Sequence, residues 1–212
     1  VFGGPLANFL LALVIFFSIY TFVGKDFTPA VINEVQKDSP AMVSGLKQND
    51  IILEIDGNKV KSILEVSKYI MMSTDEIIDF KVKRSYNELL LKVKPKIVLG
   101  EDNLGNKVNK RIVGIKLGIY NNEVNHIKLG PAQSIYYAAH EVYYVSISSL
   151  KYIGAMIFGK ADTSQLGGPI RIAKISGQVA EFGALAFISM MAYISISLGL
   201  VNLFPIPMLD GG

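Results

Sequence analysis

The chain has 212 residues, 50% of them hydrophobic, and a mean hydropathy of +0.38, which leaves room for one ordinary domain together with membrane segments. The net charge of +3 is mild and the 21 Lys and Arg residues are scattered, so the sequence lacks the basic patch of a nucleic-acid-binding protein. Because cysteine is absent, disulfides and thiolate metal sites are excluded.

The first apolar segment, residues 1–23, contains no charged side chain. As a helix it reaches roughly 35 Å, enough for a hydrocarbon core of about 30 Å. A buried core helix of a soluble domain is the alternative, but apolarity on all sides over this length is unusual there. Pro5 stands near the first turn, and Asn8 follows one turn later. We expect Asn8 to support a helix–helix hydrogen bond in the membrane, worth about 1 kcal/mol.

Residues 25–97 have the pattern of a small soluble α+β domain. Alternating and β-branched stretches predict strands, and two segments have helical spacing, the first of which begins at a capping serine, Ser39. The predicted strands are 29–35, 51–55, 77–83 and 88–93, and the predicted helices are 39–46 and 63–71.

A connector over residues 98–130 is predicted next, with a hairpin whose tip is 102–106. The acidic residues at this tip lack the spacing of a calcium loop, so a solvated turn is expected. Residues 131–181 follow as a helix, which runs to about Phe158, and a linker. The helix carries five tyrosines, which are typical of the headgroup level of a membrane. We predict a helix on the membrane surface, with a third membrane span as the alternative.

The last segment, residues 182–212, is uncharged until Asp210 and long enough to cross a bilayer. The pair Ser195 and Gly199 offers a small-residue face for close helix packing. Prolines then break the helix, which is tolerated at membrane depth only where protein or water satisfies the backbone. An ionisable residue such as Asp210 in this position indicates a functional site.

The predicted fold is therefore membrane α-helical plus α+β: two transmembrane helices, 1–24 and 182–212, bracket the soluble domain and the surface helix. Two spans joined by a long loop form a hairpin, which places Asn8 at a depth similar to that of Asn202 and Asp210. The soluble domain then lies on the opposite side of the membrane.

The end of the chain reads Asn-x-x-Pro-x-Pro-x-Leu-Asp-Gly-Gly from Asn202. This stretch resembles the NxxPxPxLDG motif of the site-2 proteases, which are zinc-dependent intramembrane proteases, and in particular the bacterial regulator-of-sigma-E protease type with PDZ domains. The GPxAN pattern at the start resembles the second transmembrane helix of the same type. The resemblance implies that Asp210 is the third zinc ligand and that Asn202 holds the substrate strand or the transition state. The residues implied as motif support are Pro5, Asn8, Pro205, Pro207, Leu209 and Gly211.

The sequence departs from that family because it contains no HExxH, the source of two zinc-binding histidines. Its two histidines are His126 and His140, and the residue four positions after His140 is Tyr144. His140 is predicted to be a surface or capping residue. We expect that an upstream helix with HExxH is missing from this fragment, that Zn²⁺ needs two further ligands from it, and that the chain alone is inactive.

The run SPAxxxGLKxxDxIxxxxG, which starts at Ser39, resembles the signature of bacterial PDZ domains. A PDZ fold binds an extended peptide at a sheet edge. The resemblance implies a groove between strand 30–35 and helix 63–72, and partners that are peptide or protein C-termini. A vestigial groove in a domain that acts as a steric cap is the alternative. The predicted groove residues are Lys25, Phe27, Val31, Ile32, Val66 and Ile70, with Lys25 and Phe27 in the loop for a terminal carboxylate.

The resemblance implies regulated intramembrane proteolysis of single-span membrane proteins, such as anti-sigma factors or signal-peptide remnants. It also implies a multi-pass protein of the bacterial inner membrane with the PDZ-like domain on the extracytoplasmic side, and the lipid bilayer as a partner. One alternative is a membrane-anchored PDZ scaffold or pseudoprotease in which Asp210 is a remnant. Another is a transporter subunit whose broken helix lines an ion path, although the two spans show no inverted repeat.

Overall fold

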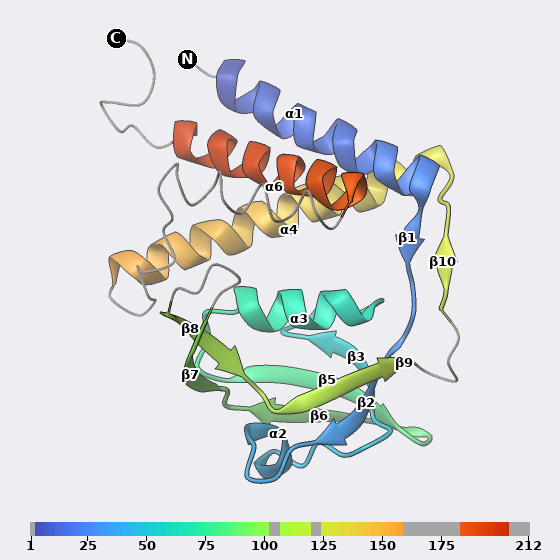
Figure 1. Cartoon of the computed structure of the whole chain (residues 1–212), viewed down its shortest axis with the longest axis vertical. Helices are drawn as coiled ribbons and strands as arrows, with labels where there is room; N and C mark the ends of the chain where they lie inside the picture. The colour runs from blue at the N-terminus through green and yellow to red at the C-terminus, as the bar shows by residue number, and fades with distance from the viewer. Residues whose placement is uncertain (1–2, 102–106, 120–123, 159–182, 204–212) are drawn as a thin grey trace. The chain divides into compact units, whose positions relative to one another are not determined.

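The computed structural model describes residues 3–101, 107–119, 124–158 and 183–203 (Figure 1). The chain divides into two compact units. We call Val1–Lys25 with Lys128–Gly212 the helical unit, and Asp26–Ile127 the sheet unit. Each unit has a core of its own.

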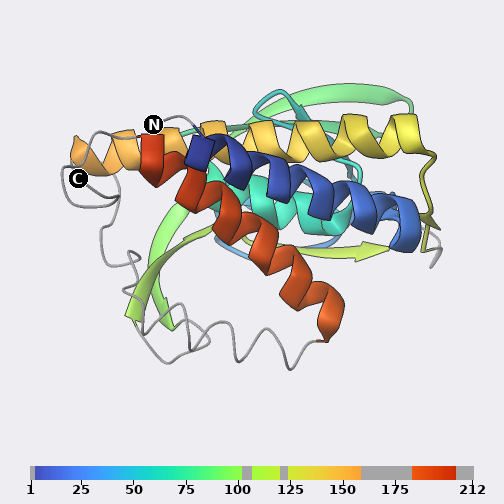
Figure 2. The ribbon, with the colours of Figure 1, turned by 90° about the horizontal axis from the view of Figure 1, so that it is seen from above.

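Three helices form the described part of the helical unit. Helix α1 packs against both of the others, and in Figure 2 α4 lies alongside it while α6 crosses it at an angle. Figure 1 shows that α4 and α6 both run in the opposite direction to α1. The bounds are α1 Gly3–Ser18 with its π-helical continuation η1 Ile19–Val23, α4 Pro131–Ile157, and α6 Ala184–Leu203.

Two helices in the described ranges are long and apolar enough to cross a membrane, Gly3–Val23 and Ala184–Leu203. The first coincides with its predicted span, 1–24, within two residues, and the second begins two residues after the start of its predicted span, 182–212. The last part of that predicted span, 204–212, lies outside the described residues. Helix α4 does not pass this test, although it matches the predicted helix 131–158 closely. Its position at a membrane surface stays a prediction.

The sheet unit is built on an antiparallel sheet of order β6-β5-β3-β2-β9, with β4 pairing β3 (Figure 1). Apolar side chains of alternate strand positions form its core with helix α3. The strands are β2 Ala30–Val35, β3 Ile51–Ile55, β4 Asn58–Lys59, β5 Ile78–Arg84, β6 Asn87–Val93 and β9 Ile115–Ile119. The largest fully buried apolar side chains of this unit are Ile32, Ile52, Ile55, Val66, Ile78, Phe80, Val82 and Val93.

Both helices of the sheet unit begin at capping serines, which the sequence analysis predicted for the first of them. The Ser39 hydroxyl accepts from the N–H of Met42 before α2 (Pro40–Val43). At α3 (Ile63–Met72), Ser62 accepts from the N–H of Glu65, whose carboxylate accepts from the N–H of Lys61 at 2.7 Å. These bonds satisfy N–H groups that the first helical turn leaves without partners.

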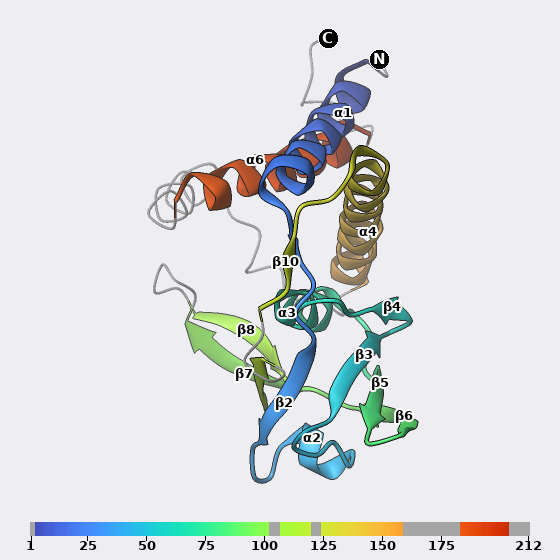
Figure 3. The ribbon, with the colours of Figure 1, turned by 90° about the vertical axis from the view of Figure 1, so that its right-hand side faces the viewer.

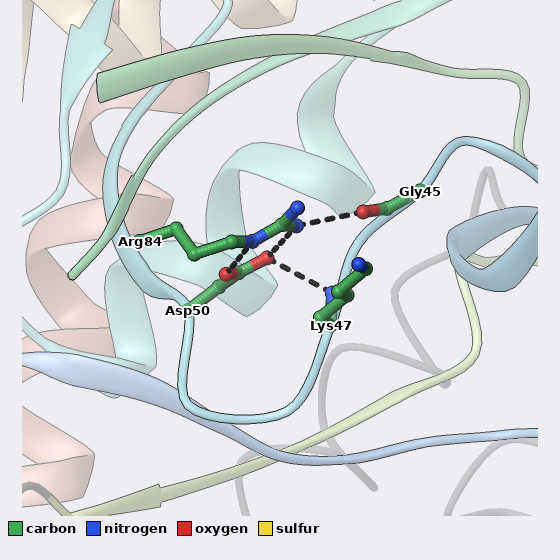
Figure 4. A network of polar contacts seen from close by, with 4 residues as sticks. All are labelled: Gly45, Lys47, Asp50 and Arg84. Atoms are coloured by element: carbon green, nitrogen blue, oxygen red, sulfur yellow. Dashed lines mark hydrogen bonds and ion pairs between the residues drawn. The ribbon is translucent and has the colours of Figure 1, made fainter. Parts of the chain in front are cut away.

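The Gly-Leu-Lys-x-x-Asp part of the signature is held together by a buried carboxylate (Figure 4). Asp50 is 0% exposed and accepts from Arg84 Nε and Nη2, both at 2.7 Å, and from the N–H of Lys47 at 2.9 Å. Arg84 Nη2 also donates to the carbonyl of Gly45. The hydrogen bond to Asp50 raises the pKa of Arg84, which stays charged. A charged fork thus joins β5 to the turn before β3.

The segment predicted as a connector, 98–130, has two structural roles. Its first part completes a hairpin of β7 (Lys96–Glu101) and β8 (Lys107–Ile112), and the predicted tip 102–106 lies outside the described residues. Its second part is β9, which pairs with β2 at the end of the main sheet. The sheet therefore extends beyond the predicted domain 25–97, because a strand far along the chain joins it.

The chain passes between the two units through a pair of short strands, β1 (Lys25–Asp26) and β10 (His126–Ile127), which lie side by side in Figures 1 and 3. The N–H of Phe27 donates to the carbonyl of Asn125 at 2.7 Å. Thr28 is buried and bonds both Asp26 and Asn125. The two connections are thus paired with each other.

Candidate functional site

The predicted site residues of the helical unit lie on α1 and α6 or beyond them. Asn202 is half-buried near the end of α6, Asn8 lies in the second turn of α1, and Pro5 is buried in its first turn. The predicted site residues of the proline-rich end lie outside the described residues. These are Pro205, Pro207, Leu209, Asp210 and Gly211.

Close packing of α6 on α1 is centred on the small residues that the sequence singled out. Ser195 Oγ donates to the main-chain carbonyl of Asn8 at 2.8 Å. A Cβ atom placed on Gly199 would lie 3.2 Å from the Phe9 ring and 3.4 Å from the Asn8 Cβ. The predicted small-residue face is therefore confirmed. The helix–helix hydrogen bond expected of Asn8 is made by its backbone carbonyl.

Asn202 continues the same face of α6. It lies seven residues after Ser195, which brings it back to nearly the same angle around the helix, and one turn beyond Gly199. Since α6 runs opposite to α1, Asn202 lies toward the first turn of α1, the turn that holds the buried Pro5 (Figure 1). The fold thus brings a polar amide to the end of a closely packed helix pair.

The predicted peptide groove of the sheet unit needs a correction. Strand β2 is paired on one side with β3 and on the other with β9, so it has no edge for an added strand. Val31, Ile32, Val66 and Ile70 are core residues with at most 8% of their surface exposed. Among the described strands, the sheet edge on this side is β9, and α3 contacts β9 as well as β2.

The predicted carboxylate loop is also placed differently. The Lys25 ammonium lies 5.6 Å from the ring centroids of both Tyr20 and Tyr137, which belong to the helical unit. Phe27 lies under the Lys61 ammonium at 5.7 Å. These contacts hold both side chains at the strand pair that joins the units.

The residues just before β9 form a bent loop held to the start of α2. Gly114 has φ of +85°, and a Cβ there would lie 2.3 Å from the Cβ of Ser39. The carbonyl of Val113 accepts from the N–H of Ala41, and that of Gly114 accepts from the N–H of Gln36, both at 2.9 Å. Only glycine fits this approach, so the loop leads into the edge strand in a fixed conformation.

The whole sequence, residues 1–212, matches Peptidase family M50. The chain belongs to this family. Two relatives named as zinc metalloproteases support the assignment. The Agrobacterium fabrum protein is 36% identical over 210 residues, covering 99% of this chain and 56% of that protein. RasP of Geobacillus kaustophilus is 34% identical over 212 residues, covering 99% of this chain and 47% of RasP.

Family M50 is that of the site-2 proteases, so the resemblance seen in the sequence is confirmed. The chain spans about half the length of these curated relatives. Among solved structures, the PDZ domain of an SdrC-like protein from Listeria monocytogenes is similar to part of the chain. It shares 26% identity and covers 43% of this chain and 88% of that domain, with a TM-score of 0.33.

Metal ligands of this M50 chain are not assembled within the described ranges, where no group of three His, Cys, Asp or Glu residues comes together. His126 and His140 are both exposed, His126 on β10 and His140 on α4. The exposed position of His140 agrees with the predicted surface role. Asp210, the predicted zinc ligand, is part of the stretch that resembles the family motif.

A buried carboxylate of the M50 helical unit was missed by the sequence analysis. Glu141 on α4 is 5% exposed, and Tyr193 Oη on α6 donates to its Oε1 at 2.9 Å. The sequence analysis treated α4 as a surface helix and gave this residue no role. The signal was present, because Glu141 stands in a stripe of small residues at helical spacing. The buried stripe of α4 is Ser134, Ala138, Glu141, Val145 and Ser148.

Proposed function

We propose that the protein to which this chain belongs is an intramembrane zinc metalloendopeptidase that cleaves single-span membrane proteins. The observation that carries the proposal is the end of α6 in an M50 chain. There Asn202 continues the face that packs on α1, and the motif with Asp210 follows within eight residues. Polar groups at the end of a close apolar helix pair are what hydrolysis inside a membrane needs.

Zinc would be held by the Asp210 carboxylate together with two histidines of an HExxH on a helix outside this sequence. A carboxylate oxygen is an ordinary zinc ligand, so Asp210 fits the metal, and the rest of the donor set has to come from elsewhere. When bound, zinc lowers the pKa of a water molecule and polarises the scissile carbonyl, with the HExxH glutamate as general base.

The residues of this chain would position the substrate. Asn202 can donate hydrogen bonds from its amide to a carbonyl of an unwound substrate segment or of the transition state. The close α1–α6 packing at Gly199, one turn from Asn202, would limit the access of water and strengthen such a bond. A substrate helix must unwind to reach this point, because helical peptide bonds are not accessible.

We propose that the sheet unit is a PDZ domain that binds the C-terminal end of a peptide. The sequence signature and the strand order support this, since β9 is an edge strand beside α3. A peptide added to β9 would gain main-chain hydrogen bonds along the edge, and alternate side chains would face α3. The PDZ domain would then screen which cut proteins enter the membrane site.

The proposed clients are anti-sigma factors or signal-peptide remnants, in regulated intramembrane proteolysis at the bacterial inner membrane. The protein would be multi-pass, with the PDZ domain on the extracytoplasmic side. Two apolar helices that can cross a bilayer support membrane insertion. A membrane-anchored PDZ scaffold or pseudoprotease is the second candidate, favoured by the separate core and open edge of the sheet unit.

The proposal is tested by reconstituting the whole protein in liposomes with a model single-span substrate. We expect cleavage by the wild type, none by Asp210→Ala, and a strongly reduced rate for Asn202→Ala. Ser189→Ala serves as the control. The Ser189 hydroxyl donates to the carbonyl of Leu185 on an exposed part of α6, so its removal should leave the rate unchanged. Equal cleavage by the wild type and Asp210→Ala would remove the assignment of Asp210 as a zinc ligand. A wild type that binds a C-terminal peptide but does not cleave the substrate would favour the scaffold.

A further inference from the structure

The helical unit contains a polar pair that the proposed protease site does not use, Glu141 of α4 and Tyr193 of α6. We propose that these two are positioning residues that fix the rotation and height of α6, and with them the place of Asn202. This inference rests on the proposed function, because it concerns the presentation of Asn202 to a substrate.

The pair joins all three described helices of the unit. Tyr193 Oη donates to Glu141 Oε1 at 2.9 Å. The Tyr193 ring also meets the Phe16 ring of α1 edge-on, with centroids 5.3 Å apart. Phe16 is 2% exposed and stacks on Tyr20, so the phenol ring is held from one side by α1 and from its hydroxyl by α4.

Stability alone does not account for a carboxylate in this place. Glu141 is 5% exposed and lies on a helix that packs against two apolar helices. Taking a carboxylate out of water is costly, and an interhelical hydrogen bond in a membrane returns only about 1 kcal/mol. An apolar residue of similar size would pack there with less cost. What the carboxylate adds is direction, since a hydrogen bond fixes the donor's position whereas apolar surfaces can slide.

The pair works together with the hydrogen bond from Ser195 to the carbonyl of Asn8. Tyr193 and Ser195 are separated by about 200° around α6, so the helix is held from two flanks. With both bonds in place, α6 can neither turn nor slide without breaking one of them. Asn202 lies nine residues beyond Tyr193, about 13 Å along the axis, and any rotation at Tyr193 is carried to it by the helix.

The first test is a set of variants of the whole protein in the liposome cleavage assay. Tyr193→Phe removes the donor and keeps the ring, and Glu141→Leu removes the acceptor. We expect each to lower kcat about fivefold, with KM unchanged, the factor expected for one interhelical hydrogen bond. Glu141→Gln keeps an acceptor oxygen and should remain within about twofold of the wild type. Tyr143→Phe is the matched control, because Tyr143 is 67% exposed on the same α4.

The double variant Tyr193→Phe/Glu141→Leu decides whether the residues act as one unit. We expect its rate to equal that of either single variant, because the second change removes nothing further. Multiplied losses would overturn the pairing. A Glu141→Gln variant as slow as Glu141→Leu would show that the charge is needed and would also overturn the inference. Melting temperatures in detergent must stay near the wild type; a fall that parallels the loss of rate would assign a merely structural role.

A second readout does not depend on proteolysis or zinc. These 212 residues contain no cysteine, and Asn8→Cys with Gly199→Cys places two thiols at positions whose Cβ atoms would be 3.4 Å apart, just below the range of about 3.5–4.5 Å that is usual in disulfides. We expect rapid oxidative cross-linking in this background and an approximately fivefold slower rate when Tyr193→Phe is added. An unchanged rate would refute the positioning role even if the protease is confirmed. A slowed rate would uphold it even if Asp210→Ala still cleaves.

Discussion

Removal of the guanidinium at Arg84 should destabilise the sheet unit strongly. In Arg84→Met the stem of the side chain remains, but Asp50 loses both of its 2.7 Å hydrogen bonds to Arg84 while it stays 0% exposed. It keeps the N–H of Lys47 as a donor. Breaking a buried pair from one side costs about 3–5 kcal/mol, because a charge is left without its partner.

The lower end of that range applies here, since the Arg84 side chain is 29% exposed and water can reach part of the pair. We therefore expect the free energy of unfolding to fall by about 3 kcal/mol, a large share of the 5–15 kcal/mol of an ordinary domain. The assay is urea unfolding of residues 26–127, followed by far-ultraviolet circular dichroism. Lys83→Met is the control. Lys83 is the exposed neighbour of Arg84 on β5, so its replacement should change the free energy of unfolding by less than about 0.5 kcal/mol.

Asp50→Asn completes a double-mutant cycle with Arg84→Met. An amide can still accept from Lys47 and does not need a cation, so the double variant should be less destabilised than the sum of the two single variants by more than about 1 kcal/mol. A loss below about 1 kcal/mol for Arg84→Met, or strictly additive losses, would refute the view that this ion pair holds the turn before β3.

Three further outcomes follow from single contacts. Gly199→Leu should push α6 away from Phe9 and Asn8 and abolish substrate cleavage, whereas Gly199→Ala requires a shift of a few tenths of an ångström and should retain most of it. Gly114→Ala should lower the free energy of unfolding, measured in urea, by about 2 kcal/mol or more, because its Cβ would lie 2.3 Å from the Cβ of Ser39. Gly57 also has a positive φ but open space around it, so Gly57→Ala should lower it by only about 1 kcal/mol. The hydrogen bond from Lys81 lowers the pKa of Glu88 below its ordinary value of 4.5. The wild type should therefore have a higher urea midpoint than Glu88→Gln at pH 6. This difference should vanish as the pH falls below 4.5 and through the lowered pKa, because the carboxylate is then protonated. An advantage that persists at pH 3 would contradict this sign.

The local elements could be predicted well because their signals are local. The strand 51–55 coincides with β3, and the helix 63–71 with α3, since the periodicity of apolar residues is visible within one strand or a few helical turns. The small-residue pair Ser195 and Gly199 also correctly predicted a face of close helix packing, which the structure places against α1.

Pairings between distant segments could not be predicted in the same way. The groove was assigned to β2 because local order does not show which strand lies at the edge, and β9 joins β2 from about 80 residues away. The buried face of α4 was also missed. The sequence analysis rested on the tyrosines of this helix, whereas its buried face is formed mainly by small residues such as Ser134 and Ala138, with Glu141 among them.

The account depends most on a metal held by Asp210, and zinc analysis of the whole purified protein tests this directly. We expect about one zinc per chain in the wild type and almost none in Asp210→Ala, because structural and catalytic zinc sites require their full set of protein ligands. Ser189→Ala, purified in parallel, should keep its zinc. Zinc retained at full stoichiometry by Asp210→Ala, or absent from the wild type, would contradict the proposed protease.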